Sequence, residues 1–171
     1  IPAQAGFLPD EWASRAQFNL FSALFSDAMA TGRMRRILGL PVAVPEAKGT
    51  QDFVALQYYT ADVVRFDPTL PGELFGRRSF PPGAEVDGEQ VYANYAPGFF
   101  SALRWAKRFG LPIFVTENGI GDAGDSLRRR YLVSHLRQLW NAVNYCWDVR
   151  GYFHRSLVDT FEWEQGWAQR F

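Results

Sequence analysis

LPIFVTENGI, residues 111–120, runs from an apolar stretch of strand-like residues directly into an acid, an amide and a glycine. A short apolar run bounded by turn residues is typical of a buried strand, and we predict one over Ile113–Val115. In parallel α/β folds, ligands bind at the carboxyl ends of the strands. Glu117 would face a pocket there, although by periodicity alone a solvated loop is the more common place for an acid beside Asn-Gly.

The chain on both sides of this segment alternates between strand and helix patterns. Residues 52–60 form an apolar run with aromatic and β-branched side chains, which predicts a buried strand. In residues 96–110, Pro97 suits a first helical turn and Gly110 suits the position just past the helix end. Residues 127–149 have a helical pattern and residues 151–159 a strand composition. The order strand, helix, strand, helix, strand predicts parallel βαβ units.

Two of these helical patterns are amphipathic. In residues 13–34, apolar side chains recur at spacings of three and four, and Gly32 is positioned to end the helix. In residues 127–149, which follow a candidate cap at Ser126, a second apolar stripe is separated from several arginines. The stripes comprise Phe18, Phe21, Phe25 and Met29, and Leu132, Leu136, Leu139, Val143 and Trp147.

Residues 67–94 are dense in proline and glycine and have no period, which predicts a long loop. Long loops in compact domains are usually functional or disordered, so this segment is a candidate contributor to a binding site. We expect residues 1–171 to form a single partial domain.

The composition excludes several classes of function. Of 171 residues, 47% are hydrophobic and 16% aromatic, which predicts a folded globular protein. Eighteen basic and eighteen acidic residues give a formal net charge of zero, which argues against a nucleic-acid or anionic-membrane partner. The single Cys146 cannot form an intramolecular disulfide, and no apolar run approaches the roughly 20 residues of a membrane span. We expect a cytoplasmic protein.

Three motifs carry a resemblance to a known family: QYYT at 57–60, VTENG at 115–119 and the segment GYFHRSLVDTFEWEQGWAQRF at 151–171. In this order and spacing they are similar to the C-terminal part of family 1 glycoside hydrolases, the β-glucosidase and β-galactosidase group. The resemblance implies the C-terminal portion of a (β/α)8 TIM barrel, an α/β fold, with about three strands and their helices. It also implies retaining hydrolysis of β-glycosides without a metal or organic cofactor.

The resemblance assigns roles to five residues. Glu117 corresponds to the catalytic nucleophile, a carboxylate that attacks the anomeric carbon. Tyr59 corresponds to a tyrosine whose hydroxyl orients that carboxylate. Glu162 and Trp163 match residues that bind sugar hydroxyls, and Phe171 matches an aromatic of the same pocket. Composition alone would place Tyr59 and the aromatic tail in a core, so these roles depend on the resemblance.

Two positions in this chain depart from the family pattern. Gln57 stands where the family usually has asparagine, which adds one methylene near the sugar. Arg155, followed by Ser156, replaces the tryptophan that lies beneath the sugar ring, so apolar stacking area is lost and a fixed positive charge is added. One hypothesis is that Arg155 favours an anionic or otherwise unusual glycone. The other is that the site is weakened or non-catalytic.

The second carboxyl group that retaining hydrolysis needs is missing from the sequence. The family carries its acid/base glutamate in an NEP motif on an earlier strand, and no NEP occurs in the 171 residues. Because the two carboxyl groups must lie about 5 Å apart, we expect the isolated chain to be inactive and to pair with the N-terminal part of the same barrel. The alternative is a non-catalytic sugar-binding or interaction module derived from this family.

Other candidate sites in the sequence are weak. No Cys or His lies at metal-ligand spacing from His135, and a satisfied or solvated histidine is the expected state of both His135 and His154. The glycine-rich residues 119–124 lack the spacing of a dinucleotide fingerprint. The basic run at residues 127–131 is expected to be a solvated helix start.

Overall fold

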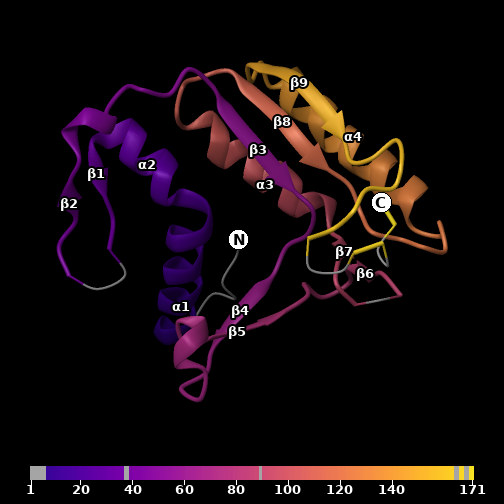
Figure 1. The fold of residues 1–171 in the computed structure, drawn as a ribbon, viewed down its shortest axis with the longest axis horizontal. Coiled ribbons are helices and arrows are strands. Elements are labelled where there is room, and N and C mark those ends of the chain that lie inside the picture. The colour runs from indigo at the N-terminus through magenta and orange to yellow at the C-terminus, as the bar shows by residue number, and fades with distance from the viewer. Residues whose placement is uncertain (1–6, 37–38, 89, 164–165, 168–169) are drawn as a thin grey trace. The chain divides into compact units, whose positions relative to one another are not determined.

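The computed structural model of the protein describes residues 7–36, 39–88, 90–163, 166–167 and 170–171. The chain forms two compact units, the first made of residues 1–52 and 62–79 and the second of residues 53–61 and 80–171 (Figure 1). The expectation of one partial domain over the whole chain stays a prediction. None of the helices in the described ranges combines the length and apolar character that crossing a bilayer requires.

A parallel three-stranded sheet is the centre of the second unit. Its strands are β3 (Val54–Tyr58), β8 (Ile113–Asn118) and β9 (Val149–His154), in the order β3-β8-β9. Helix α3 (Ala96–Lys107) connects the first two strands and α4 (Arg128–Asn144) connects the last two. Figure 1 shows the three strands side by side with both helices beside them. The predicted βαβ order is confirmed.

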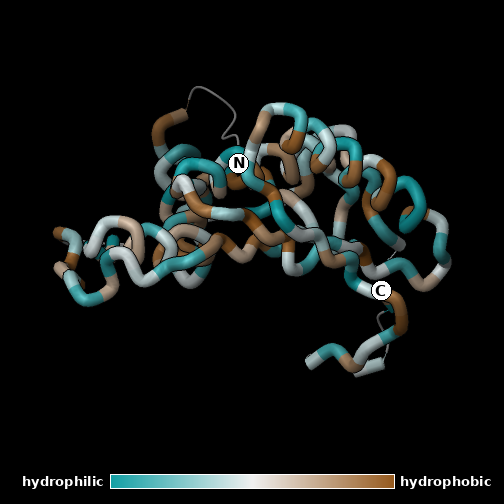
Figure 2. Tube along the Cα trace, turned by 90° about the horizontal axis from the view of Figure 1, so that it is seen from above, coloured by the Kyte–Doolittle hydropathy of each residue, from teal (hydrophilic) through white to brown (hydrophobic). Residues whose placement is uncertain are grey.

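The core of the second unit lies between this sheet and its two helices. Strand β3 alternates buried and exposed residues, so it buries one face rather than the whole apolar run. Both helices contribute residues to the same core. Hydrophobic and hydrophilic residues are mixed along each helix, as expected when one face packs on a sheet and the other does not (Figure 2). Its buried members are Val54, Leu56, Tyr58, Phe99, Leu103, Ala106, Ile113, Val115 and Ala142.

Helix α4 differs from its prediction in both its cap and its buried face. Ser126 is not the cap; the Oδ2 atom of Asp122 accepts hydrogen bonds from the backbone N–H groups of Leu127 at 2.6 Å and Arg128 at 3.2 Å. The predicted stripe was wrong in part: Leu139 and Trp147 pack against the core, but the fully buried face is displaced by one residue, about 100° around the helix. Among its members Leu136 is 39% and Val143 51% exposed. The buried residues of α4 are Tyr131, His135 and Ala142.

The first unit begins with a helix that is longer than predicted and interrupted. It comprises α1 (Leu8–Phe18), the π-helical segment η1 (Asn19–Ala23) and α2 (Leu24–Thr31). Gly32 follows with φ +70°, a left-handed conformation that favours glycine, which confirms its predicted role as the helix stop.

The predicted apolar stripe of this helix is not its buried face. Phe21, within the π-helical segment, and Phe25, in α2, are each 73% exposed. Gln17 is buried instead, and its Nε2 donates to the carbonyl oxygens of Glu73 at 2.7 Å and Gly76 at 3.0 Å.

The predicted loop at residues 67–94 was wrong in part, because it contains short paired strands. In the first unit, β4 (Val63–Phe66) pairs antiparallel with β5 (Gly76–Ser79) across the one-turn helix η3 (Pro71–Glu73). In the second unit, β6 (Glu85–Val86) pairs antiparallel with β7 (Ala93–Asn94). Strands of two to four residues are too short to show a period in the sequence. The first unit also contains β1 (Arg33–Met34), β2 (Val42–Ala43) and the short helix η2 (Pro45–Ala47).

Candidate active site

Glu117 lies within strand β8, close to its carboxyl end. The strand continues to Asn118, three residues beyond the predicted end at Val115. β8 is the central strand, so its neighbours on both sides continue the backbone ladder past the apolar run. A bulge between Leu56 and Gln57 of β3 shifts the register, which pairs Gln57 with Glu117. The central position therefore fixes where the carboxylate emerges from the sheet.

Two neutral donors from β3 and its following residue hold the Glu117 carboxylate, one on each oxygen. Gln57 Nε2 donates to Oε1 at 3.1 Å, and the Tyr59 hydroxyl donates to Oε2. Burial, and then the hydrogen bond to Glu117, raise the pKa of Tyr59 well above its ordinary value, so the hydroxyl keeps its proton. Within the described residues, both hydrogen bonds to this carboxylate therefore come from neutral groups.

Three aromatic rings gather beside this carboxylate. The ring centroids of Tyr59 and Phe171 lie 5.8 Å apart, edge to face, and Tyr92 lies 5.7 Å from Tyr59 and 5.5 Å from Phe171. Phe171 is only 4% exposed. Tyr92 was missed by the sequence analysis, because it stands in the aperiodic segment before β7 and no pattern distinguishes it.

Two hydrogen bonds to the backbone carbonyl of Arg170 hold this residue and Phe171 in place. The carbonyl oxygen of Arg170 accepts hydrogen bonds from the Asp122 N–H at 2.8 Å and from Arg128 Nη2 at 3.0 Å. Phe171 therefore reaches the aromatic group through contacts with the loop after β8 and the start of α4. Sequence could name this residue but not the contacts that place it.

Asn118 links the ends of the three parallel strands and is fully buried. Its Nδ2 donates to the Tyr58 carbonyl at 2.8 Å and to the Tyr131 hydroxyl at 3.0 Å, and its Oδ1 accepts from the Tyr152 hydroxyl at 2.9 Å. The Tyr131 hydroxyl in turn donates to the Tyr59 carbonyl at 2.8 Å. Every polar atom of this side chain has a partner, so Asn118 rigidifies the backbone that carries Glu117 and Tyr59.

Arg155, after the end of β9, lies between the aromatic group and Glu162. Its guanidinium carbon lies 5.0 Å from the centroid of the Phe171 ring. Its Nη2 donates to Thr160 Oγ1 at 3.0 Å and forms an ion pair with Glu162 Oε1. The structure therefore brings Arg155, Glu162 and Phe171 together, but as an ion pair stacked on a ring. The peptide bond that joins Arg155 to Ser156 is cis.

The backbones after β8 and β9 approach each other closely at Gly119. A Cβ added to this glycine would lie 1.7 Å from the carbonyl oxygen of Arg155, so the position excludes any side chain. The Arg155 N–H also donates to the Asn118 carbonyl at 3.0 Å. The glycine of the TENG motif thus joins the two strand ends that carry Glu117 and Arg155.

Trp163 is the predicted site residue that the structure does not bring to this group. Its side chain is 93% exposed, although Glu162 beside it is largely covered. The assignment of Trp163 to sugar binding therefore stays a prediction.

The two histidines have different surroundings, and neither is part of a metal cluster. His135 is fully buried, stacks on Tyr131 with centroids 3.7 Å apart, and donates from Nδ1 to the Tyr131 carbonyl at 2.8 Å. Burial lowers the pKa of His135 from 6.5 to about 4, and burial also lowers the pKa of His154. No group of three His, Cys, Asp or Glu residues within the described ranges is arranged to hold a metal ion.

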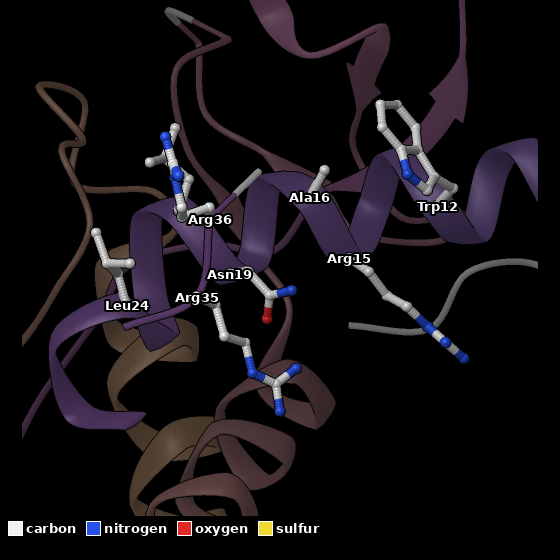
Figure 3. A pocket seen from close by; sticks show the side chains of 8 residues that line it. Trp12, Arg15, Ala16, Asn19, Leu24, Arg35 and Arg36 are labelled. Carbon is white, nitrogen blue, oxygen red and sulfur yellow. The ribbon is translucent and has the colours of Figure 1, made fainter. Parts of the chain in front are cut away.

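A separate pocket of about 220 Å³ lies in the first unit, beside α1 and β1 (Figure 3). Figure 3 shows the guanidinium groups of Arg15, Arg35 and Arg36 pointing in different directions, so they do not converge on one ligand position. Arg15 and Arg35 are also paired with Glu11 and Asp27. The pocket is lined by Trp12, Arg15, Ala16, Asn19, Leu20, Leu24, Arg35 and Arg36.

Parallel strands joined by helices, with polar side chains at the carboxyl ends of the strands, define part of a (β/α)8 barrel. The sequence profile described as Glycosyl hydrolase family 1 matches residues 42–171, and the chain belongs to this family.

Relatives of known class are similar over most of the chain. A β-galactosidase of Pyrococcus woesei is 31% identical over 166 residues, which cover 88% of this chain and 32% of the relative. A β-galactosidase of Sulfolobus acidocaldarius is 38% identical over 127 residues, covering 70% and 26%. The chain thus spans about a third or less of the length of these enzymes.

Solved structures give the same result for the fold. A β-glycosidase from Pyrococcus horikoshii superposes with a TM-score of 0.84 and 31% identity, covering 99% of this chain and 39% of that one. The 171 residues therefore correspond to part of a family 1 barrel, as the three sequence motifs predict.

Proposed function

We propose that this chain supplies the nucleophile side of a retaining β-glycosidase that acts on β-linked glycosides. The observation that carries the proposal is Glu117, at the carboxyl edge of a parallel sheet, with each carboxylate oxygen held by a neutral donor from Gln57 or Tyr59. A carboxylate held in one orientation is the group that can attack carbon and form a glycosyl ester. Relatives named β-galactosidase and 1,4-β-D-glucan glucohydrolase support the substrate class.

The reaction follows from the chemistry of a carboxylate nucleophile. Glu117 attacks the anomeric carbon, the bond to the leaving oxygen breaks, and a glycosyl ester forms on Glu117. Water then attacks the same carbon and releases Glu117 as a carboxylate. Gln57 and Tyr59 orient the Glu117 carboxylate before it attacks. They donate to it again when hydrolysis of the ester releases it.

A second carboxyl group must protonate the leaving oxygen and later deprotonate water. The sequence lacks the NEP motif of the family's acid/base, so we propose that this group comes from the remaining part of the barrel. The partner of this chain is then the N-terminal part of the same barrel, and the isolated chain does not turn over unactivated glycosides.

A covalent trap tests the nucleophile. The full-length enzyme that contains this chain should accumulate a glycosyl ester with 2-deoxy-2-fluoro-β-glucosyl fluoride, and peptide mass spectrometry should locate the ester on Glu117. The 2-fluoro group slows hydrolysis of the ester more than its formation when the leaving group is good. A label on another residue, or none, would refute the assignment.

The alternative is a sugar-binding module that has lost catalysis, and the ion pair between Arg155 and Glu162 is the observation that favours it. Native mass spectrometry of the 171-residue chain distinguishes the enzyme from the sugar-binding module. A companion polypeptide with the second glutamate supports the enzyme, and glucose binding without any trapped ester supports the module.

A further inference from the structure

The ion pair between Arg155 and Glu162 leaves one side of each group open. Both hydrogen bonds to the Glu162 carboxylate within the described residues, from Arg155 and Thr160, are made to Oε1. Within the same residues, no hydrogen bond to Glu162 Oε2 is found, and the Arg155 guanidinium donates only from Nη2. The two side chains remain 26% and 21% exposed, so ligand can reach them.

The charges around this pair oppose an anionic ligand. The Arg155 guanidinium is already paired with Glu162, and Glu117 is a second carboxylate of the candidate site. An anionic sugar would bring a further negative group to a guanidinium that is already paired, with a cost that grows as water leaves the site. The positive charge that Arg155 adds to the family pattern is thus used within the protein.

We propose that Arg155 is a positioning residue of the glycone subsite, which fixes Glu162 so that Oε2 accepts hydrogen bonds from a neutral sugar. This inference rests on the proposed function. Phe171 supports the guanidinium from below through its ring, and Thr160 bonds both partners, so the pair has one preferred geometry. The subsite therefore takes neutral glycones such as glucose or galactose, and Arg155 determines how tightly they bind.

Kinetics of the full-length enzyme with p-nitrophenyl β-D-glucoside test the proposal. Arg155→Met should raise KM about tenfold and change kcat by less than about threefold, because the lost contact acts on sugar binding. Arg155→Lys keeps the charge but loses the planar fork, so its KM should lie between those of the wild type and Arg155→Met. Circular dichroism confirms that each variant is folded.

The coupling between the two residues is the decisive readout. Glu162→Gln should also raise KM about tenfold, and the double variant should be no worse than Glu162→Gln alone, because Arg155 acts through Glu162. Arg150→Met is the matched control: it breaks an ion pair with Asp148 at the start of β9, and KM should stay within about twofold. Additive losses of Arg155 and Glu162 would overturn the proposal.

Two further experiments distinguish a failure of this inference from a failure of the proposed function. Faster turnover of p-nitrophenyl β-D-glucuronide than of the glucoside, reversed in Arg155→Met, would overturn the neutral subsite in favour of an anionic one. Binding of D-glucose, measured by titration calorimetry, should show the same coupling between Arg155 and Glu162 without turnover. If Glu117→Gln retains activity the nucleophile assignment fails, while the glucose titrations still decide the role of Arg155.

Discussion

Two carboxylates, Glu117 near the end of β8 and Glu162 in the segment after β9, are held by opposite kinds of donor. Glu117 is held on both oxygens by neutral donors, the amide of Gln57 and the hydroxyl of Tyr59. Glu162 is held on one oxygen by a guanidinium that also lies over Phe171. Neutral donors orient a carboxylate and leave its charge available, whereas an ion pair cancels that charge and leaves an acceptor. We therefore propose that the environment, and not the residue type, separates the nucleophile from the binding group.

Replacing each carboxylate by an amide is the sharpest test of this comparison. Glu117→Gln should lower kcat about 10⁴-fold or more, because the amide cannot form the glycosyl ester. Glu162→Gln should act mainly on KM. Steady-state kinetics of the two variants of the full-length enzyme provide the measurement, and equal effects on kcat would break the distinction between the two sites.

The backbones after β8 and β9 can approach each other because residue 119 is glycine. A side chain at this position should force them apart. Gly119→Ala would put Cβ 1.7 Å from the Arg155 carbonyl oxygen, and backbone cannot yield as a flexible side chain can. The free energy of unfolding should fall by more than about 3 kcal/mol, measured by urea denaturation.

Gly124→Ala is the matched control for this change. Its added Cβ would meet its nearest atom, Asp122 Oδ1, at 3.8 Å, which is an ordinary contact. Stability should change by less than about 1 kcal/mol. A similar loss in both variants would show that the close approach at Gly119 is not the cause.

Removing one hydroxyl tests the orientation of Glu117 alone. Tyr59→Phe keeps the ring contacts with Phe171 and Tyr92 but removes the donor to Glu117 Oε2. We expect kcat to fall about 10-fold to 100-fold, with a small change in KM. Tyr145→Phe, at a 67% exposed position, should leave both constants unchanged. Full activity of Tyr59→Phe would contradict the orienting role.

The lowered pKa of the buried His135 predicts how acid changes the free energy of unfolding. Its pKa is about 4 in the folded protein and 6.5 ordinarily, so the unfolded state binds more protons between these values. The free energy of unfolding should fall as pH drops from 6.5 to 4. The total loss is up to about 3 kcal/mol, because one pKa unit corresponds to about 1.36 kcal/mol. Below pH 4, His135 has no further effect.

Urea denaturation across this pH range checks the prediction with two variants. His135→Phe should remove most of the acid slope, because the position then no longer titrates and the ring still stacks beside Tyr131. His154→Gln should leave most of the slope in place. An unchanged slope in His135→Phe would show that another group causes it.

The smallest effect is expected at Gln57. Gln57→Asn restores the shorter amide typical of the family, and Tyr59 still holds the other oxygen of Glu117. We expect kcat/KM to change by less than about fivefold in either direction. A loss above about 100-fold would show that the longer amide is required to reach Glu117 here.

Patterns in the sequence predicted the parallel sheet and its two helices because long elements carry their own periodicity and end signals. Residues 67–94 gave no such signal, since their strands have two to four residues and depend on pairing for their structure. The buried face of α4 was displaced by one residue because Tyr131 and His135, which are polar on hydropathy scales, are buried by stacking and hydrogen bonding.

The sequence by itself determined the family, the order of the core elements, and Glu117 with Tyr59 as its partner, because these depend on local motifs and their spacing. Only the tertiary structure decided that Arg155 pairs with Glu162 over Phe171, that Asp122 caps α4, and that Tyr92 joins the aromatic group. These contacts join residues far apart in the chain or choose among several local partners. Their partners are selected by the geometry of packed strand ends, which no local pattern encodes.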